Sequence, residues 1–246
     1  MRIDIWSDVV CPWCSIGKRR LDTALAGFEH AEEVEVVYHS YQLDPAAPSE
    51  PTERARDMLA RRYRMSPAQA AQAQDRVTAL AAEEGMSWRH DETWHVNTAA
   101  AHRLLHLALA EAGPATQAAL KEALWQAHFG EARNVADRGV LTELAVEVGL
   151  DADRVAAVLG SEEFAEAVEA DVRRAAALGA TGVPFFVIDD KFGISGAQPA
   201  ELFGQALERA WAERAPLQMV GAVGQDGTPD PAADPDAACG PDGCAV

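Results

Sequence analysis

The sequence Cys-Pro-Trp-Cys at positions 11–14 constrains this chain more than any other feature. Residues 2–7, just before it, alternate as a strand does, and residues 16–28 have the apolar spacing of a helix. The pair therefore lies between a strand and a helix, with Cys11 at or next to the helix N-terminus. Unpaired backbone N–H groups and the positive end of the helix dipole favour a thiolate there.

This position gives the two sulfurs different predicted roles. Because the thiolate is the nucleophile of disulfide exchange, we expect Cys11 to attack a substrate disulfide. Cys14, one turn further into the helix and less accessible, is expected to resolve the mixed disulfide. Pro12 suits the first helical turn, where its missing N–H would have no partner. Trp13 is predicted to cover the sulfurs or contact substrate, or else to be an ordinary helix-surface aromatic.

Asp8 lies three residues before the first cysteine, and two roles are open to it. Its carboxylate can take part in a proton relay by accepting a proton from Cys14 during resolution. Alternatively, it accepts backbone hydrogen bonds in the loop.

A second short element, Thr-Gly-Val-Pro at 181–184, stands immediately before a strand-like run. A proline at a strand start has no N–H to offer the sheet. The backbone of Val183 is then free to pair with an extended substrate chain as an added strand. We therefore predict that Val183 and Pro184 contact substrate.

The remaining elements predict an α/β chain whose sheet is divided by a helical block. Strands are expected at 2–7 and 34–38, both apolar enough for the sheet interior. After the helical block, a strand at 184–188, a hairpin turn, a short strand at 192–195 and a helix at 199–213 follow. Helix signals fill the stretch between, with a capping box at 66–69 and N-caps expected at Asp137, Asp151 and Ser161.

The charge and hydropathy of the chain limit which partners it can bind and in which compartment we expect it. The formal charge of −18 opposes binding to nucleic acid or to an anionic membrane surface. There is no apolar run of about 18 residues to span a membrane. The first residues form a strand pattern where a secretory signal would be basic and then apolar, so we expect a cytoplasmic protein. In that compartment a cysteine pair is more often catalytic or metal-binding than structural.

The last segment, 215–246, is rich in Gly, Pro and Asp and is predicted to be a flexible acidic tail. It carries a second pair, Cys239 and Cys244. A disulfide across so short a loop removes little unfolded-state entropy, so a structural staple explains the pair poorly. We consider two roles: a relay dithiol that exchanges with the first pair, or idle thiols.

Metal binding explains the cysteines less well than redox chemistry. Four thiolates match tetrahedral zinc, but the first pair lies at a helix start and the tail offers no fold to hold an ion. His102 and His106 lie four apart on one helix face, without the glutamate of the metalloprotease pattern. Packing or capping explains them better, and we expect no metal and no cofactor.

These motifs together resemble the DsbA family of thioredoxin-fold oxidoreductases, and within it the cytoplasmic FrnE-like branch. Besides the cysteine motif and Gly182-Val183-Pro184, further positions fit that branch: Asp8, Gly17, Asn97, Ala101-His102-Arg103-Leu104 and Ser195-Gly196-Ala197. The resemblance implies a thioredoxin fold with an inserted all-helical domain, a dithiol cycle at Cys11 and Cys14, and a cis-proline at Pro184. Periplasmic members usually carry His where this chain has Trp13.

The resemblance also implies boundaries and partners. Residues 1–48 and 180–214 would form the split thioredoxin-like domain, and residues 49–179 the insertion. Substrates would be proteins or small molecules bearing a disulfide or thiol, with glutathione or a thioredoxin-type protein as recycling partner. Two alternatives remain: a glutathione-dependent isomerase or transferase of the same fold, which usually has Ser at the attacking position, and a non-catalytic chaperone or scaffold.

Overall fold

The structure is a computed structural model that describes residues 1–214. Met1–Trp211 form one compact unit, and of the second unit, Ala212–Val246, residues 212–214 are described. Within the described part of the chain, no helix has the length and apolar character needed to cross a membrane.

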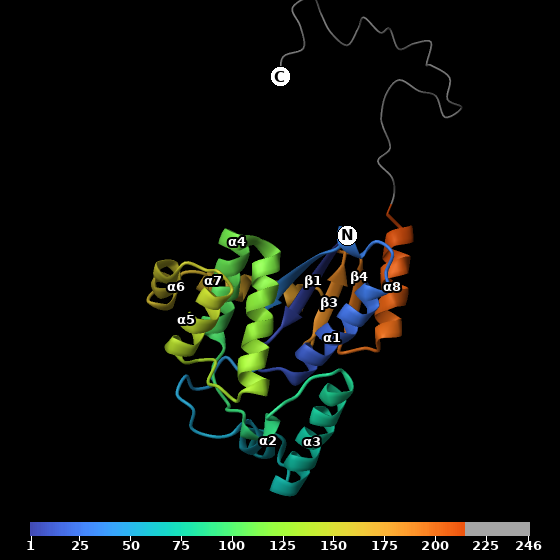
Figure 1. Ribbon diagram of the computed structural model, residues 1–246. Coiled ribbons are helices and arrows are strands. Elements are labelled where there is room, and N and C mark those ends of the chain that lie inside the picture. Colours follow the sequence, from blue (N-terminus) through green and yellow to red (C-terminus); the bar gives the residue numbers. More distant parts are fainter. Residues whose placement is uncertain (215–246) are drawn as a thin grey trace, which may run out of the picture. The chain divides into compact units, whose positions relative to one another are not determined.

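A four-stranded sheet in the order β2-β1-β3-β4 brings both ends of the compact unit together (Figure 1). Its strands are β1 (Arg2–Ser7), β2 (Glu35–Ser40), β3 (Phe185–Ile188) and β4 (Phe192–Ser195). β1 pairs parallel with β2 and antiparallel with β3, which in turn pairs antiparallel with β4. The strand before the cysteines therefore lies directly beside the strand that follows Pro184.

Helices follow the predicted order around this sheet. In the described residues they are α1 (Pro12–Ala26), α2 (Ala55–Tyr63), α3 (Pro67–Glu83), α4 (Ala99–Trp125), α5 (Arg138–Glu147), α6 (Ala152–Leu159), α7 (Ala165–Ala177) and α8 (Ala200–Ala212). Short turns of other helix types are η1 (Ala31–Glu33), η2 (His90–Glu92) and the π-helical η3 (Gln126–Gly130). α4 is kinked where Gly113 leaves helical geometry just before Pro114 (φ 82°, ψ 178°). α4 therefore consists of two halves that meet at this point.

The alternation of side chains along β1 assigns different helices to the two faces of the sheet. Ile3 and Ile5 share a buried cluster with Leu21 of α1 and Phe203 of α8. Figure 1 shows these two helices lying together on one side of the strands. Trp6 points the other way and packs in a separate cluster that includes Ala175 of α7. Both faces of the sheet are therefore covered by helices.

β2 is an edge strand, so the prediction that it lies inside the sheet is wrong. Its apolar character has another cause: α4 packs along it. The side-chain oxygen of Gln117 accepts a hydrogen bond from the Tyr38 N–H at 2.9 Å, and its amide nitrogen donates to the Tyr38 carbonyl at 2.8 Å. One glutamine thus satisfies the edge as a neighbouring strand would.

The predicted helix starts are confirmed at three places. Ser66 and Gln69 make both reciprocal hydrogen bonds of a capping box at the start of α3. Asp137 and Asp151 each accept a hydrogen bond from the backbone N–H three residues further on, at the starts of α5 and α6. Local hydrogen bonding was sufficient to predict these caps.

The N-cap predicted at Ser161 is wrong. α7 begins at Ala165, after Phe164 in the left-handed conformation (φ 65°). The Ser161 hydroxyl donates instead to the Ala157 carbonyl of α6 at 2.8 Å and accepts from the Glu163 N–H at 3.2 Å. The Ser161 hydroxyl therefore closes the turn after α6. α7 begins without a side-chain cap.

Candidate active site

Cys11 is the N-cap residue of α1, with extended backbone (φ −91°, ψ 111°) and Pro12 in the first turn. Its own N–H donates to the Asp8 carbonyl at 3.4 Å, and its carbonyl accepts from the Cys14 N–H at 3.1 Å. α1 starts earlier than its apolar spacing indicates, because the proline needs no hydrogen-bond partner for its nitrogen. The cysteine pair thus occupies the first turn, where α1 leaves backbone N–H groups unpaired.

Both cysteines are free thiols, and both are buried: Cys11 is 2% exposed and Cys14 is 1% exposed. The Cys11 thiol donates to the carbonyl of Val183 at 3.7 Å, and the peptide bond between Val183 and Pro184 is cis. Burial, together with a hydrogen bond to Cys11, raises the pKa of Cys14 well above its usual value. Cys14 is therefore held as a protonated thiol behind Cys11.

Gly17 allows α1 to lie directly on the Pro184 segment. A Cβ added to Gly17 would lie 3.1 Å from the Pro184 ring and 3.2 Å from the Phe186 ring, closer than packed side chains usually approach. The absence of a side chain at this position therefore sets the distance between the cysteine helix and the loop that faces it.

Asp8 is buried and its carboxylate is fully engaged. One oxygen accepts from the Leu43 N–H at 2.8 Å, and the other lies 3.2 Å from Nε2 of His102. Burial favours a raised pKa for Asp8, but the hydrogen bonds and the nearby Lys121 ammonium outweigh it and leave the pKa lowered. Asp8 is therefore an anion that anchors the loop after β1, and one of its partners is a backbone N–H, as the second interpretation of this residue requires.

Lys121 of α4, which the sequence reasoning missed, lies behind the dithiol with no exposed surface. Its ammonium is 3.4 Å from the Ser7 carbonyl and 5.1 Å from the ring centre of Trp125. Burial lowers the pKa of Lys121 to about 8, against the opposing effect of Cys14, Asp8 and Cys11. A buried cation thus faces both thiols.

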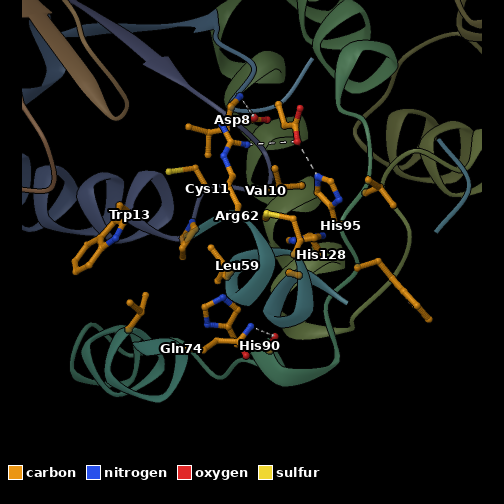
Figure 2. Close-up of a pocket in the computed structure, with 18 of the residues that line it drawn as sticks. Asp8, Val10, Cys11, Trp13, Leu59, Arg62, Gln74, His90, His95 and His128 are labelled. Carbon is orange, nitrogen blue, oxygen red and sulfur yellow. Dashed lines mark hydrogen bonds and ion pairs between the residues drawn. The ribbon is translucent and has the colours of Figure 1, made fainter. Parts of the chain in front are cut away.

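A cavity of about 420 Å³ opens beside Cys11. Figure 2 shows side chains of α1 and of the helical insertion, among them Trp13, Leu59 and Arg62, around it. The sequence-predicted residues that line it are Asp8, Cys11, Pro12, Trp13 and Val183. The cavity brings these predicted residues together at the Cys11 side of the dithiol, and Trp13 keeps 40% of its surface exposed.

Residues 2–208 match the family model described as a DSBA-like thioredoxin domain. The chain belongs to this family. The four-stranded sheet with an inserted helical region has the thioredoxin fold that this family description names.

Individual proteins resemble this chain to different degrees. The chain is 46% identical to a probable DsbA oxidoreductase from Streptomyces coelicolor, with a TM-score of 0.84 over 100% of this chain and 99% of that one. It is 28% identical to the uncharacterized protein YwbO of Bacillus subtilis (strain 168), over 84% of this chain and 96% of that protein. The cytosolic disulfide reductase DsbM from Pseudomonas aeruginosa, solved with GSH, shares the fold at 20% identity and a TM-score of 0.59, over 86% of this chain and 100% of that one.

Two further histidines near the cavity were not predicted. His90 is in η2 and His128 is in the π-helical turn η3, a helix type that often occurs at functional sites. Burial lowers their pKa values to about 4 and about 3, so both are neutral imidazoles at pH 7. The second cysteine pair, Cys239 and Cys244, lies outside the described residues.

Proposed function

We propose that this protein is a thiol–disulfide oxidoreductase that acts on protein or small-molecule disulfides through Cys11 and Cys14. The observation that carries the proposal is the placement of Cys11. Its thiol lies at the N-cap of α1 and lines a cavity, while Cys14 sits one turn behind it, buried and protonated. Membership in the family described as a DSBA-like thioredoxin domain, and the 46% identity to a probable DsbA oxidoreductase, support the same chemistry.

The exchange proceeds in two balanced steps. The Cys11 thiolate attacks one sulfur of a disulfide, the S–S bond breaks, and the first product leaves as a thiolate that takes up a proton. Cys14 then loses its proton and attacks the Cys11 sulfur, which releases the second product as a thiol. The dithiol has given up two electrons and the substrate disulfide has gained them. Run in reverse, the same steps oxidise a substrate dithiol.

The charges behind the dithiol support both steps. The Lys121 ammonium stabilises negative charge as it develops on either sulfur, because the site excludes water. With a pKa of about 8, Lys121 also exists in part as a neutral amine near pH 7, and in that form it can accept the proton that Cys14 loses, for which it is better matched than Asp8. In this proposal Asp8 holds the loop and balances the ammonium, and the proton relay first considered for Asp8 passes to Lys121.

A catalytic cycle requires a second thiol or disulfide to restore the starting state. Glutathione or a thioredoxin-type protein has the chemistry to reduce the Cys11–Cys14 disulfide. We place the protein in the cytoplasm, in the FrnE-like branch of the family, on the strength of the residues that resemble that branch. Expression of an epitope-tagged full-length chain followed by cell fractionation tests this placement.

The deciding experiment is the redox equilibrium of Cys11 and Cys14 in a series of glutathione buffers, read by alkylation and peptide mass spectrometry. We expect a two-electron transition with a midpoint between about −270 mV and about −120 mV. Cys14→Ser should accumulate a mixed disulfide on Cys11, and Cys11→Ser should abolish disulfide exchange. If Cys11 neither exchanges nor alkylates faster than a thiol in a denatured control, the isomerase or scaffold alternatives replace this proposal.

A further inference from the structure

The cavity beside Cys11 has the size and lining of a small-molecule site, which narrows the substrate class. Resting on the proposed function, we propose that it binds the body of a small disulfide that is uncharged, mostly apolar, and carries a hydrogen-bonding group at one end. The reacting sulfur would lie at Cys11 and the apolar body among the side chains of the helical insertion.

The dimensions and walls of the cavity support a compact occupant. Its volume of about 420 Å³ is within the range of small-molecule pockets, about 300–1,000 Å³. The wall opposite Cys11 comes from α2, α3 and the segment before α4, and its apolar members include Met58, Leu59, Val77, Trp94 and Val96. Such a lining favours an apolar body.

The charged groups that line the cavity are paired with other protein groups. Arg62 lies 3.4 Å from the Asp44 carboxylate, which also lies 3.1 Å from Nε2 of His95. Figure 2 shows Arg62 and His95 joined through this carboxylate. The Asp8 carboxylate already interacts with the His102 ring and the Leu43 N–H. A charged ligand would compete with these pairs, whereas an uncharged ligand leaves them intact and suits the cavity better.

Two ring nitrogens of the cavity lining have no hydrogen-bond partner among the described residues, Nδ1 of His95 and Nδ1 of His128. The first lies 3.5 Å from the Glu53 carboxylate, which leaves His128 as the polar group for the ligand. His128 lines the cavity and is 1% exposed, and its Nδ1 has no hydrogen-bond partner among the described residues. The ring of His90, by contrast, contacts the Thr78 hydroxyl at 3.1 Å. Because a buried polar atom without a partner is unfavourable, a ligand group that bonds to His128 would gain from its desolvated surroundings.

The redox step on such a substrate is the exchange already described. The Cys11 thiolate bonds to the sulfur nearest to it, the substrate S–S bond breaks, and the other half leaves as a thiol after taking up a proton. Cys14 then displaces the bound half, so one substrate disulfide becomes two thiols while Cys11 and Cys14 form a disulfide. A thiol such as glutathione reduces the protein again.

The test compares three disulfides on the reduced full-length protein. They are 4,4′-dithiodipyridine, which has uncharged rings and a ring nitrogen at each end, 2-hydroxyethyl disulfide, which is small and polar, and insulin, a protein disulfide. Leu59→Trp fills the cavity from α2, and Val77→Trp fills it from α3. Leu202→Trp, at an exposed leucine of α8, is the matched control.

We expect each filling variant to lower the second-order rate constant with 4,4′-dithiodipyridine by about tenfold or more. The rates with 2-hydroxyethyl disulfide and insulin should stay within about twofold of wild type, and Leu202→Trp should change none of the three. Comparing each disulfide with itself across variants removes differences in intrinsic reactivity. If both filling variants leave the 4,4′-dithiodipyridine rate unchanged, or slow all three disulfides alike, the inference is overturned.

A binding measurement separates this inference from the proposed function. The inert analogue 4,4′-thiodipyridine, which has one sulfur and no S–S bond, is titrated into wild type, Leu59→Trp and His128→Phe by calorimetry. Saturable binding that weakens at least about fivefold in both variants supports the site even if Cys11 proves unreactive. If wild type exchanges disulfides but does not bind this analogue, the inference fails while the proposed function stands.

Discussion

Among single residues, Lys121 is the clearest example of a buried charge that lowers the stability of the fold and serves the proposed chemistry of the dithiol. Its pKa is about 8 in the folded protein and 10.5 when unperturbed, so below pH 8 its protonation opposes folding. We therefore expect Lys121→Met to raise the free energy of unfolding at pH 7 by about 1–3 kcal/mol. The same change should slow alkylation of Cys11 at pH 7 by about three- to tenfold, because the thiolate loses a nearby cation.

Urea unfolding and timed alkylation with peptide mass spectrometry measure the two effects on the same samples. Lys18→Met is the control, since it removes a partly exposed cation of the same helix α1, which pairs with Asp22 at 2.5 Å. It should change neither quantity by as much. A Lys121→Met protein that is destabilised, or that alkylates at the wild-type rate, contradicts the electrostatic role of this lysine.

Site residues could be predicted where the residues that define them are neighbours in the sequence, and were missed where those residues are far apart. Cys11 and Cys14 were identified because two residues of spacing at a helix start already define their chemistry. Lys121 of α4 reaches the dithiol and His128 of η3 reaches the cavity beside Cys11, and only the folded chain brings them there. Gln117, Lys121 and Trp125 do recur every four residues on the buried face of α4. Hydrogen-bonding side chains at this helical spacing were a signal in the sequence, but a search for apolar residues alone does not detect it.

For the secondary-structure elements, a buried ionic cluster joins β1, β2 and α7 on the face of the sheet away from α1. His39 of β2 bridges two carboxylates, with Nε2 2.5 Å from Asp4 and Nδ1 2.8 Å from Asp171. Arg2 also pairs with Asp4 at 2.8 Å, and His106 of α4 lies 3.1 Å from Asp171. Burial alone lowers the pKa of His39, but the two carboxylates outweigh it and leave the pKa raised.

This cluster predicts a pH dependence with a definite sign. Because the pKa of His39 is raised on folding, its contribution is complete below the unfolded value of 6.5 and is lost as pH rises through the folded pKa. The lowered pKa values of Asp4 and Asp171 contribute above the unfolded value of 3.8, and that part is lost on acidification. We expect His39→Phe to cost about 2–4 kcal/mol near pH 5.5 and progressively less above pH 7.

Urea unfolding of both proteins from pH 4 to pH 9 gives this difference directly. Phenylalanine keeps a ring against Trp6, which stacks on His39 at 4.5 Å, so the comparison isolates the charge. His30→Phe, at a partly exposed histidine 3.6 Å from an exposed glutamate, is the control and should show a smaller, flatter difference. A His39→Phe cost that grows with pH would contradict the assignment.

The elements themselves were predicted where their causes are local. The capping box of α3, the caps of α5 and α6 and the Asp189–Asp190 hairpin all depend on residues within a few positions. The edge position of β2 was not predicted, because its apolar side chains fit an interior strand equally well. What decides its place is α4, whose Gln117 satisfies the edge, and no short window of sequence contains that contact.

Over the whole molecule, the helical insertion and the sheet share their cores. Trp125 and Phe129, which belong to the insertion, pack in the cluster of Ile3, Ile5 and the α1 and α8 side chains. Val9, from the loop that leads to Cys11, packs in the cluster of the insertion. The loop that leads to Cys11 is therefore held between the two cores. Neither core is complete without residues from the other part of the chain.

This sharing bears on the proposed boundaries, with residues 1–48 and 180–214 as the thioredoxin-like domain and 49–179 as its insertion. Because the cores interlock, we expect the two parts to unfold in one cooperative transition. Far-UV circular dichroism reports the helices, most of which are in the insertion, and pulsed alkylation of the buried Cys14 reports the sheet cluster. Their urea midpoints should coincide within about 0.2 M, a small fraction of the transition width expected at this size.

Separated midpoints would show that the insertion folds on its own and that the shared side chains contribute little. The Trp125→Ala variant distinguishes coupled cores from an independently folding insertion. The Trp125 ring is 2% exposed, and its indole N–H donates to the Asp8 carbonyl at 3.2 Å. The substitution removes about 3–5 kcal/mol of packing at the junction of the two cores. If the cores are coupled, both probes must shift to lower urea together; if the insertion is independent, only one of them moves.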